Sequence, residues 1–369
     1  MKILVDGMPR GIGGIGSLVM NIVNYSKQKK DNLIFDFLLP KGSKYKKILE
    51  ENGYQCWETP DFSQTIKYFN FVRKFFDVNK YDYLWFNNTS KVNVILPLLA
   101  KRIGMAKIIT HTHGVDFEEK GLKYVFFKVI NAINTPVMFA MVDVPLACSK
   151  EAARIYYKYN KKLLCSVNVI SNGIDVDKYI YSEKERVERR HQLHIEENQI
   201  LLGAIGRLTK VKNYSFLLNV LGKLPVKYKL IILGDGELYE TLKKEIQEKK
   251  LEDRCYLLGN CKNVSSYLLA MDMFLLPSLN EGIPFSIIEA QASGLPCIAS
   301  DSLTREFNIT GLVQYRNICL EDEWSNAILQ YSKNVQRKKY SSVVRNKGYG
   351  IDTSYKKFVN SLKMEKKCL

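Results

Sequence analysis

The segment from Pro277 to Glu289 carries the residue types best suited to chemistry in this chain. Its two glutamates, Glu281 and Glu289, are separated by seven residues that include a glycine and a proline. Proline suits the first turn of a helix, so the pattern predicts a loop that runs into a helix beginning near Phe285. Free backbone N–H groups at a helix start attract phosphate, and Glu289, one turn in, can accept hydrogen bonds from two ribose hydroxyls. The segment therefore predicts a nucleotide site.

Glu281 lies in the loop, where it would face a sugar attached to the nucleotide. The residues between the glutamates that we assign to the same site are Gly282, Ile283, Pro284 and Phe285. The alternative, for this segment alone, is that the two carboxylates only balance the positive end of a helix dipole.

A basic pair, Arg207 and Lys212, follows an apolar run and flanks a turn. A forked guanidinium and a compact ammonium both suit a diphosphate. Cations at this position would also stabilise the negative charge that develops on a diphosphate leaving group. The alternative is a solvated basic loop.

A glycine-rich loop, Gly11 to Gly16, follows the first apolar run and precedes a helical pattern. Glycines let the backbone approach a ligand, and the helix start favours an anion. The loop also matches the dinucleotide-binding spacing, with Asp36 about 20 residues later. However, Asp36 lies inside the next apolar run rather than at its end, which disfavours a dehydrogenase. A tight turn without a ligand is a third interpretation.

Two of the four histidines, His111 and His113, end another apolar run. Strand carboxyl ends are where α/β sheets bind ligands, so we expect one of the two histidines to act near the active site. A zinc site would need Asp116 to complete an unusual ligand set, and it is weakly supported. Asp175 and Asp177 match an Asp-x-Asp cation motif, but they lie in a turn. We therefore expect no metal.

Short apolar runs alternate with helical patterns along the whole chain, which predicts parallel α/β structure. The first series comprises residues 3–5, 35–39, 83–86, 107–111, 144–148 and 167–170, and the second comprises 199–205, 229–233, 255–258, 273–276, 296–299 and 311–314. A charged helical stretch, 181–191, separates them. The predicted domains are residues 1–172 and 173–335, with a helical tail, 336–369.

Composition narrows the class of protein. Among 369 residues, the 55 Lys and Arg exceed the 38 Asp and Glu by 17, which implies an anionic partner: nucleic acid, an acidic membrane or a phosphorylated substrate. The eight cysteines form no Cys-x-x-Cys pair, and the first residues are too short an apolar run for a signal peptide, so we expect a cytoplasmic protein. The amphipathic stretch from Lys120 to Ile133 suits either core packing or peripheral contact with an anionic membrane.

Taken in order, these segments resemble the family-4 glycosyltransferases of the GT-B fold, and bacterial capsule and exopolysaccharide transferases in particular. The glycine loop, the histidine strand end and the Glu-x7-Glu segment all carry the resemblance. Further matches are Ala147-Cys-Ser149, Ile170-Ser-Asn-Gly-Ile-Asp175, Gly206-Arg-Leu with Lys212-Asn, and Leu233-Gly-Asp-Gly-Glu237. The resemblance implies two Rossmann-like domains facing across a cleft, with the C-terminal helix returning to the first domain.

The resemblance also implies the chemistry. Arg207 and Lys212 would bind the donor diphosphate, Glu289 the ribose and Glu281 the transferred sugar. Either His111 or His113 would be the active-site histidine. Residues implied to line the donor site elsewhere are Gly13, Gly14, Gly16 and Gly234.

The implied reaction transfers a hexose or N-acetylhexosamine, with retention of configuration, from a UDP-sugar to a lipid-linked oligosaccharide at the inner membrane face. It needs no cofactor and no protein nucleophile. Two alternatives stay open: a UDP-sugar 2-epimerase on the same fold, and a basic nucleic-acid-binding protein. The latter would need a continuous basic stripe with interleaved aromatic residues.

Overall fold

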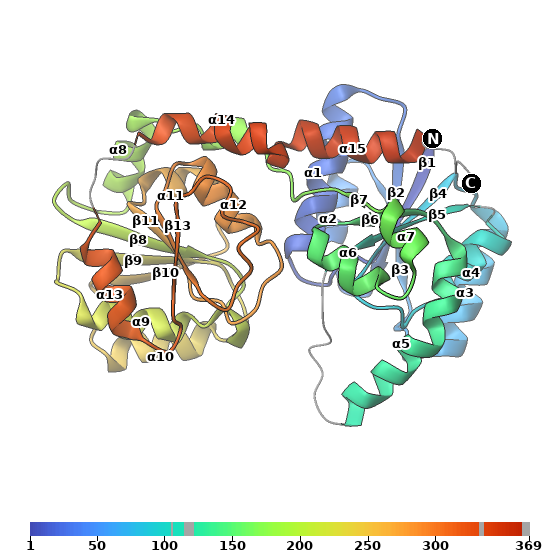
Figure 1. The fold of residues 1–369 in the computed structure, drawn as a ribbon, viewed down its shortest axis with the longest axis horizontal. Helices are drawn as coiled ribbons and strands as arrows, with labels where there is room; N and C mark the ends of the chain where they lie inside the picture. Colours follow the sequence, from blue (N-terminus) through green and yellow to red (C-terminus); the bar gives the residue numbers. More distant parts are fainter. Residues whose placement is uncertain (105, 114–121, 332–335, 364–369) are drawn as a thin grey trace. The chain divides into compact units, whose positions relative to one another are not determined.

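The computed structural model describes residues 1–104, 106–113, 122–331 and 336–363 (Figure 1). The chain divides into two compact units. Unit 1 comprises residues 1–173 and 351–369, and unit 2 comprises residues 174–350. The chain therefore passes from unit 1 to unit 2 and back.

Unit 1 contains a seven-stranded parallel sheet in the order β3-β2-β1-β4-β5-β6-β7. Its strands are β1 (Lys2–Asp6), β2 (Ile34–Pro40), β3 (Gln55–Thr59), β4 (Tyr83–Asn88), β5 (Lys107–Thr112), β6 (Val142–Ala147) and β7 (Asn168–Val169). Its helices are α1 (Gly14–Lys29), α2 (Tyr45–Glu51), α3 (Thr65–Val78), α4 (Ile95–Arg102), α5 (Leu122–Met141), α6 (Lys150–Tyr157), α7 (Lys161–Ser166) and α15 (Ile351–Lys363).

Helix α15 completes the core of unit 1, although it comes from the end of the chain. Phe358 packs against Trp85 of β4 with 4.4 Å between ring centroids, and both side chains are fully buried. The Tyr83 hydroxyl donates to the Leu362 carbonyl at 2.7 Å. Helices α1 and α15 lie side by side in Figure 1. Strand β4, buried along its whole length, is thus covered by a segment about 270 residues later in the sequence.

Unit 2 contains a six-stranded parallel sheet in the order β10-β9-β8-β11-β12-β13. Its strands are β8 (Ile200–Ile205), β9 (Tyr228–Leu233), β10 (Cys255–Gly259), β11 (Met273–Leu276), β12 (Cys297–Ser300) and β13 (Val313–Arg316). Its helices are α8 (Glu183–Gln192), α9 (Tyr214–Lys223), α10 (Tyr239–Glu248), α11 (Val264–Ala270), α12 (Phe285–Ala292), α13 (Glu321–Leu329) and α14 (Tyr340–Val344), with short turns η1 (Val176–Tyr179), η2 (Lys210–Lys212), η3 (Arg337–Lys339) and η4 (Arg345–Tyr349).

Both faces of the unit 2 sheet are buried, because alternate side chains of each strand enter two separate apolar layers. Leu201 and Phe274 belong to one layer, whereas Leu202 and Leu275 belong to the other. Such double burial explains why the strands read as continuous apolar runs in the sequence.

The predicted α/β class is confirmed, and every predicted run forms a strand in the expected order. Strand β3 was not predicted. It lies at the edge of the sheet, where only Thr59 is buried, so its residues alternate too weakly to stand out.

In each sheet the first strand lies in the interior, and the strands that follow it in sequence are added first on one side of it and then on the other. Strand β1 lies between β2 and β4, and β8 lies between β9 and β11. Loops that follow the strands at such a reversal diverge and leave room for a ligand. Each unit therefore presents one favoured ligand position, at the carboxyl ends of these strands.

Candidate active site

In unit 2, two glycines bring the loops after β8 and β9 into contact. A Cβ atom on Gly234 would lie 1.9 Å from the Gly206 carbonyl oxygen, so no larger residue fits there. Both glycines have positive φ, +156° for Gly206 and +141° for Gly234. Lys212 passes close to Gly206, since a Cβ there would lie 3.2 Å from the lysine Nζ. The glycines thus bring backbone and an ammonium group to one point.

Lys212 forms an ion pair with Glu281, in the loop after β11. Glu281 also accepts a hydrogen bond from the buried Ser278 hydroxyl at 2.9 Å. The Leu279 N–H donates to the Val211 carbonyl at 2.8 Å, which ties the two loops together. Only 17% of the Lys212 side chain and 16% of the Glu281 side chain are exposed. The structure therefore joins two residues that the sequence separates by 69 positions.

Arg207 differs from Lys212, because its side chain is exposed. Within the described ranges it makes no ion pair. The Tyr214 hydroxyl, beneath the same loop, is buried and has no hydrogen-bond partner among the described residues. Burial, and secondly the charge of Glu281, raises the pKa of Tyr214, so this hydroxyl stays protonated.

Helix α12 begins at Phe285, as the sequence predicted, and its N-cap is Pro284. No side chain caps the first turn, which leaves its N–H groups for another acceptor. Glu289, one turn in, accepts a hydrogen bond from the Tyr179 hydroxyl of η1. Burial raises the pKa of Glu289 to about 7, and the Tyr179 hydrogen bond opposes this shift. Glu289 is therefore half ionised near neutral pH.

In unit 1, the two histidines have different surroundings. His111 is fully buried within β5, and its ring stacks on Trp85. His113 comes one residue after β5 and is half-buried. The two rings are 4.4 Å apart. Burial lowers the pKa of both imidazoles, that of His113 to about 3, so both are neutral at physiological pH.

Asp6 and Asn87 lie beside His113 at this strand end, and the sequence analysis did not assign either of them. The Asn87 side chain contacts His113 Nε2 at 2.8 Å and the Asp6 carbonyl oxygen at 3.1 Å. Burial raises the pKa of the Asp6 carboxyl to about 7, although the Gly7 N–H bond opposes the shift. Gly7 is required here, because a Cβ would lie 1.7 Å from the Asn87 carbonyl oxygen. Asp6 and Asn87 come together because β1 and β4 are neighbours in the sheet, which the sequence alone does not reveal.

The glycine loop of unit 1 packs against the side chain of Tyr45. Helix α1 begins at Gly14 with Gly13 as its N-cap. The Tyr45 hydroxyl accepts from the Gly13 N–H at 3.1 Å, and a Cβ on Gly16 would lie 2.1 Å from that hydroxyl. Asp36 is buried, paired with Lys2 and hydrogen-bonded by Tyr81, so it is not placed to bind a ribose. These contacts disfavour the dinucleotide interpretation and give Gly16 a packing role.

Comparison with known proteins shows which enzymes the chain is similar to. Residues 185–309 match the family model for glycosyl transferases group 1. The chain is a glycosyltransferase, and its residues 185–309 are similar to the group 1 enzymes. EpsF of Bacillus subtilis (strain 168), which is named as a glycosyltransferase, is 27% identical over 316 residues, covering 82% of this chain and 79% of EpsF.

A second relative of this glycosyltransferase is the Escherichia coli enzyme named UDP-Gal:alpha-D-GlcNAc-diphosphoundecaprenol alpha-1,3-galactosyltransferase. It is 29% identical over 252 residues, which are 65% of this chain and 62% of that enzyme. Among solved structures, Anabaena HepE in complex with UDP and glucose superposes with a TM-score of 0.79 at 18% identity, over 98% of this chain and 99% of HepE. That likeness establishes the GT-B fold.

The described part of the glycosyltransferase holds no cluster of three or more His, Cys, Asp or Glu side chains that could bind a metal ion. Asp177 pairs with Arg345 at 2.6 Å, and Asp175 pairs with Lys178 at 3.3 Å. Asp116 lies outside the described residues. The Asp-x-Asp pair therefore acts in local ion pairs.

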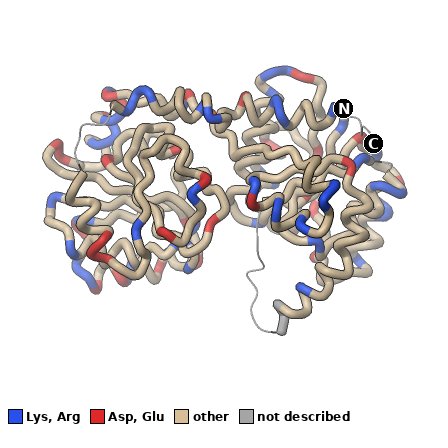
Figure 2. Tube along the Cα trace, in the orientation of Figure 1, with Lys and Arg blue, Asp and Glu red and all other residues tan. Residues whose placement is uncertain are grey.

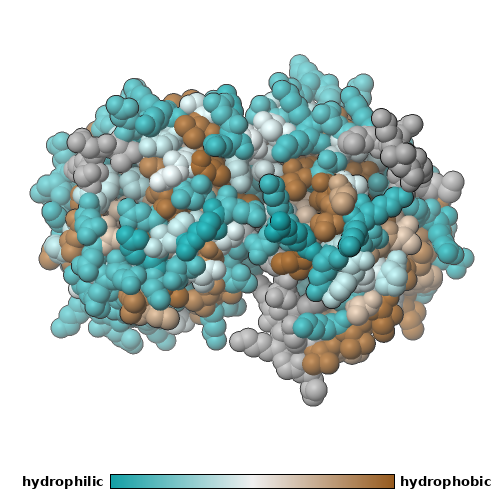
Figure 3. All heavy atoms as spheres, viewed as in Figure 1, coloured by the Kyte–Doolittle hydropathy of each residue, from teal (hydrophilic) through white to brown (hydrophobic). Residues whose placement is uncertain are grey.

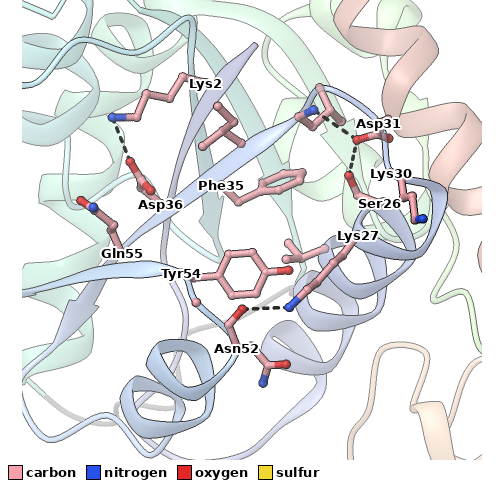
Figure 4. Close-up of a pocket in the computed structure, with 14 residues that line it drawn as sticks. Lys2, Ser26, Lys27, Lys30, Asp31, Phe35, Asp36, Asn52, Tyr54 and Gln55 are labelled. Atoms are coloured by element: carbon pink, nitrogen blue, oxygen red, sulfur yellow. Dashed lines mark hydrogen bonds and ion pairs between the residues drawn. The ribbon is translucent and has the colours of Figure 1, made fainter.

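A cavity of about 600 Å³ lies at the opposite, amino-terminal edge of the unit 1 sheet (Figure 4). Two of its three lysines already have partners: Lys2 pairs with Asp36 at 3.1 Å, and Lys27 donates to the Asn52 carbonyl at 2.9 Å. Ligands of open α/β sheets bind at the carboxyl ends of strands instead. We do not assign this cavity to the glycosyltransferase site.

Proposed function

We propose that this glycosyltransferase transfers a hexose or N-acetylhexosamine from a UDP-sugar to a lipid-linked oligosaccharide in capsule or exopolysaccharide synthesis, with retention of anomeric configuration. One observation carries the proposal. The loop after β11 holds Glu281 against Lys212 and then opens an uncapped helix with Glu289 one turn in. This arrangement suits the sugar, the diphosphate and the ribose of one nucleotide sugar.

The diphosphate would bind at Lys212 and Arg207, with the N–H groups of the first turn of α12. Lys212 is preorganised by Glu281, whereas the exposed Arg207 would close onto the phosphates when they bind. Cations placed where charge develops on the leaving phosphate stabilise the transition state, which is typically worth several kcal/mol. The ribose hydroxyls would donate to the Glu289 carboxylate.

Retention of configuration is supported by how the two glutamates are held. Glu281 is engaged by Lys212 and Ser278, and Glu289 by Tyr179. Neither of these two glutamates is therefore free to attack the sugar carbon. Attack by the acceptor hydroxyl on the same face as the departing phosphate needs no such nucleophile.

A lipid-linked acceptor is supported by an apolar face on helix α5. Five large apolar side chains recur there at helical spacing and are 42–67% exposed: Val125, Phe126, Val129, Ile133 and Val137. Apolar atoms gather over this helix in Figure 3. Phe139 of α5 packs on Tyr156 and Tyr157 of α6. Basic side chains are exposed on α6, on α7 and in the turn between them: Lys150, Arg154, Lys158, Lys161 and Lys162.

An apolar helix face beside basic side chains suits the surface of an anionic bilayer. No helix in the described part of the chain is long and apolar enough to cross a membrane. We therefore infer peripheral binding at the inner face of the cell membrane, where a polyprenyl-linked acceptor would be available.

The test uses purified enzyme, a panel of nucleotide sugars and a polyprenyl-diphosphate sugar acceptor, with release of nucleotide and glycolipid product measured. Lys212→Ala and Glu289→Ala should weaken donor binding and turnover, while the exposed neighbour variant Lys210→Ala should not. Unchanged donor binding in both site variants would refute the site.

The same assay separates the alternatives. Isomerised sugar nucleotide without any acceptor would identify an epimerase. Salt-sensitive RNA or DNA binding would favour a nucleic-acid-binding protein. Figure 2 argues against the latter, because Lys and Arg are spread over both units rather than along one stripe.

A further inference from the structure

The side chain of Asn87 connects Asp6 to His113 at the carboxyl ends of β1, β4 and β5. Asn87 is 2% exposed. Its Nδ2 donates to the Asp6 backbone carbonyl at 3.1 Å, and its Oδ1 lies 2.8 Å from His113 Nε2. The amide is thus held at both ends.

These two contacts determine which imidazole nitrogen carries the proton. A backbone carbonyl can only accept, so the amide nitrogen of Asn87 must face Asp6 and the amide oxygen must face His113. An amide oxygen also only accepts, so His113 Nε2 must carry a hydrogen. In a neutral imidazole the other nitrogen, Nδ1, is then unprotonated and accepts hydrogen bonds.

The neighbouring histidine has the same tautomer for an independent reason. The Trp85 indole N–H contacts His111 Nδ1 at 3.4 Å, and because this group only donates, His111 Nδ1 must accept. His111 then carries its proton on Nε2, and that nitrogen has no hydrogen-bond partner among the described residues, so it does not donate to His113 Nδ1. No described residue donates to His113 Nδ1, and the half-buried ring leaves it open to a ligand.

We propose that Asn87 is a positioning residue that fixes His113 as the Nε2-protonated tautomer, so that Nδ1 accepts a hydrogen bond from a hydroxyl of a sugar substrate. The proposal rests on the function proposed above. It makes His113 a neutral acceptor that orients a sugar, rather than an acid that protonates the leaving phosphate.

Three variants of the full-length enzyme test this role. Asn87→Leu removes both hydrogen bonds with little change in volume. Asn87→Asp keeps an acceptor for His113 Nε2, and its negative charge should raise the histidine pKa. Asn88→Leu is the matched control, since the adjacent buried side chain donates to the Tyr156 hydroxyl at 3.0 Å instead.

The tautomer is read from the nitrogen chemical shifts of ¹⁵N-histidine, with the His113 resonances assigned by their loss in His113→Gln. In the wild-type enzyme we expect an unprotonated Nδ1 and a protonated Nε2. Asn87→Leu should give a mixture of tautomers, and Asn87→Asp and Asn88→Leu should retain the Nε2-protonated form. A wild-type His113 protonated on Nδ1 would overturn the proposal.

Turnover tests the second half of the proposal. Asn87→Leu should lower kcat about tenfold with unchanged UDP affinity, as expected for the loss of one hydrogen bond to the sugar. Asn87→Asp should keep most of the turnover, with the pH profile displaced upward. If Asn87→Leu scrambles the tautomer without slowing the reaction, Nδ1 does not hold a sugar hydroxyl.

Donor hydrolysis without acceptor distinguishes the two sugars. If Asn87→Leu slows hydrolysis and transfer equally, His113 contacts the transferred sugar. If it slows transfer alone, His113 contacts a sugar of the acceptor. If no donor in the panel is turned over by wild-type enzyme, the proposed function and the sugar contact both fail, while the nitrogen shifts still decide whether Asn87 sets the tautomer.

Discussion

The two strand-end sites occupy the same topological position in their sheets but differ in charge. In unit 2 the ammonium of Lys212 is held against Glu281 beside two glycines. In unit 1 the corresponding position holds a neutral His113 and a carboxyl, Asp6, whose pKa burial raises to about 7. A diphosphate needs compensating cations, whereas sugar hydroxyls need uncharged donors and acceptors. In the proposed function, one fold repeated twice therefore supplies two kinds of recognition.

The largest effect is expected when the charged site of unit 2 is disrupted. Lys212→Ala should lower kcat/KM about hundredfold, or roughly 3 kcal/mol, because a cation beside the leaving diphosphate is lost and Glu281 is left unpaired. Steady-state kinetics with the identified donor measures the effect. Lys210→Ala, in the same turn, should stay within twofold, and an equal loss in both variants would assign the effect to general surface charge.

The second prediction concerns the neutral site. His113→Ala should lower kcat about tenfold and leave UDP affinity unchanged, because in the proposal the residue forms one hydrogen bond to a sugar and none to the nucleotide. Calorimetric titration of UDP beside turnover separates the two quantities. The exposed His191→Ala serves as control. Weakened UDP binding in His113→Ala would contradict the proposal that unit 2 binds the nucleotide and that His113 contacts only a sugar.

The third prediction uses the raised pKa of Glu289. Only the ionised carboxylate accepts two hydroxyl hydrogen bonds, and with a pKa near 7 its ionised fraction rises between pH 6 and pH 8. Affinity for UDP-glucose, whose phosphates do not titrate in this range, should rise about tenfold over that interval, in proportion to the ionised fraction. Glu289→Gln should bind weakly with no such pH dependence. A wild-type affinity that is flat with pH would contradict the prediction.

The last prediction concerns the stability of unit 1 and not its ligand binding. The Asp6 carboxyl ionises near pH 4 when unfolded but near pH 7 when folded. Below pH 4 it is protonated in both states. As pH rises, the unfolded state loses its proton first, so the free energy of unfolding falls until about pH 7. Asp6→Asn should reduce that fall by about 1 to 3 kcal/mol in urea denaturation, whereas the exposed control Asp77→Asn should not.

The sequence predicted the strands well because both faces of each sheet are buried, which gives unbroken apolar runs. The start of α12 was also predicted correctly, because Gly282 and Pro284 just before it are local signals of a helix start. The edge strand β3 was missed because only one of its side chains is buried. The partnership of Lys212 with Glu281, and that of Asp6 with Asn87, depends on strand order, which residue types do not encode. The choice between His111 and His113 likewise required knowing that Trp85 covers one of them.

The return of α15 to unit 1 has a consequence for synthesis on the ribosome. Unit 2 is one continuous segment, residues 174–350, and the Ile174 N–H donates to the Tyr349 carbonyl at 2.9 Å, so the unit begins and ends at one point. Unit 1, although translated first, lacks Phe358 over Trp85 until nearly the whole chain has been made. The usual order, in which the N-terminal domain is completed first, is therefore reversed here. A nascent chain would carry an exposed β4 face throughout the translation of unit 2.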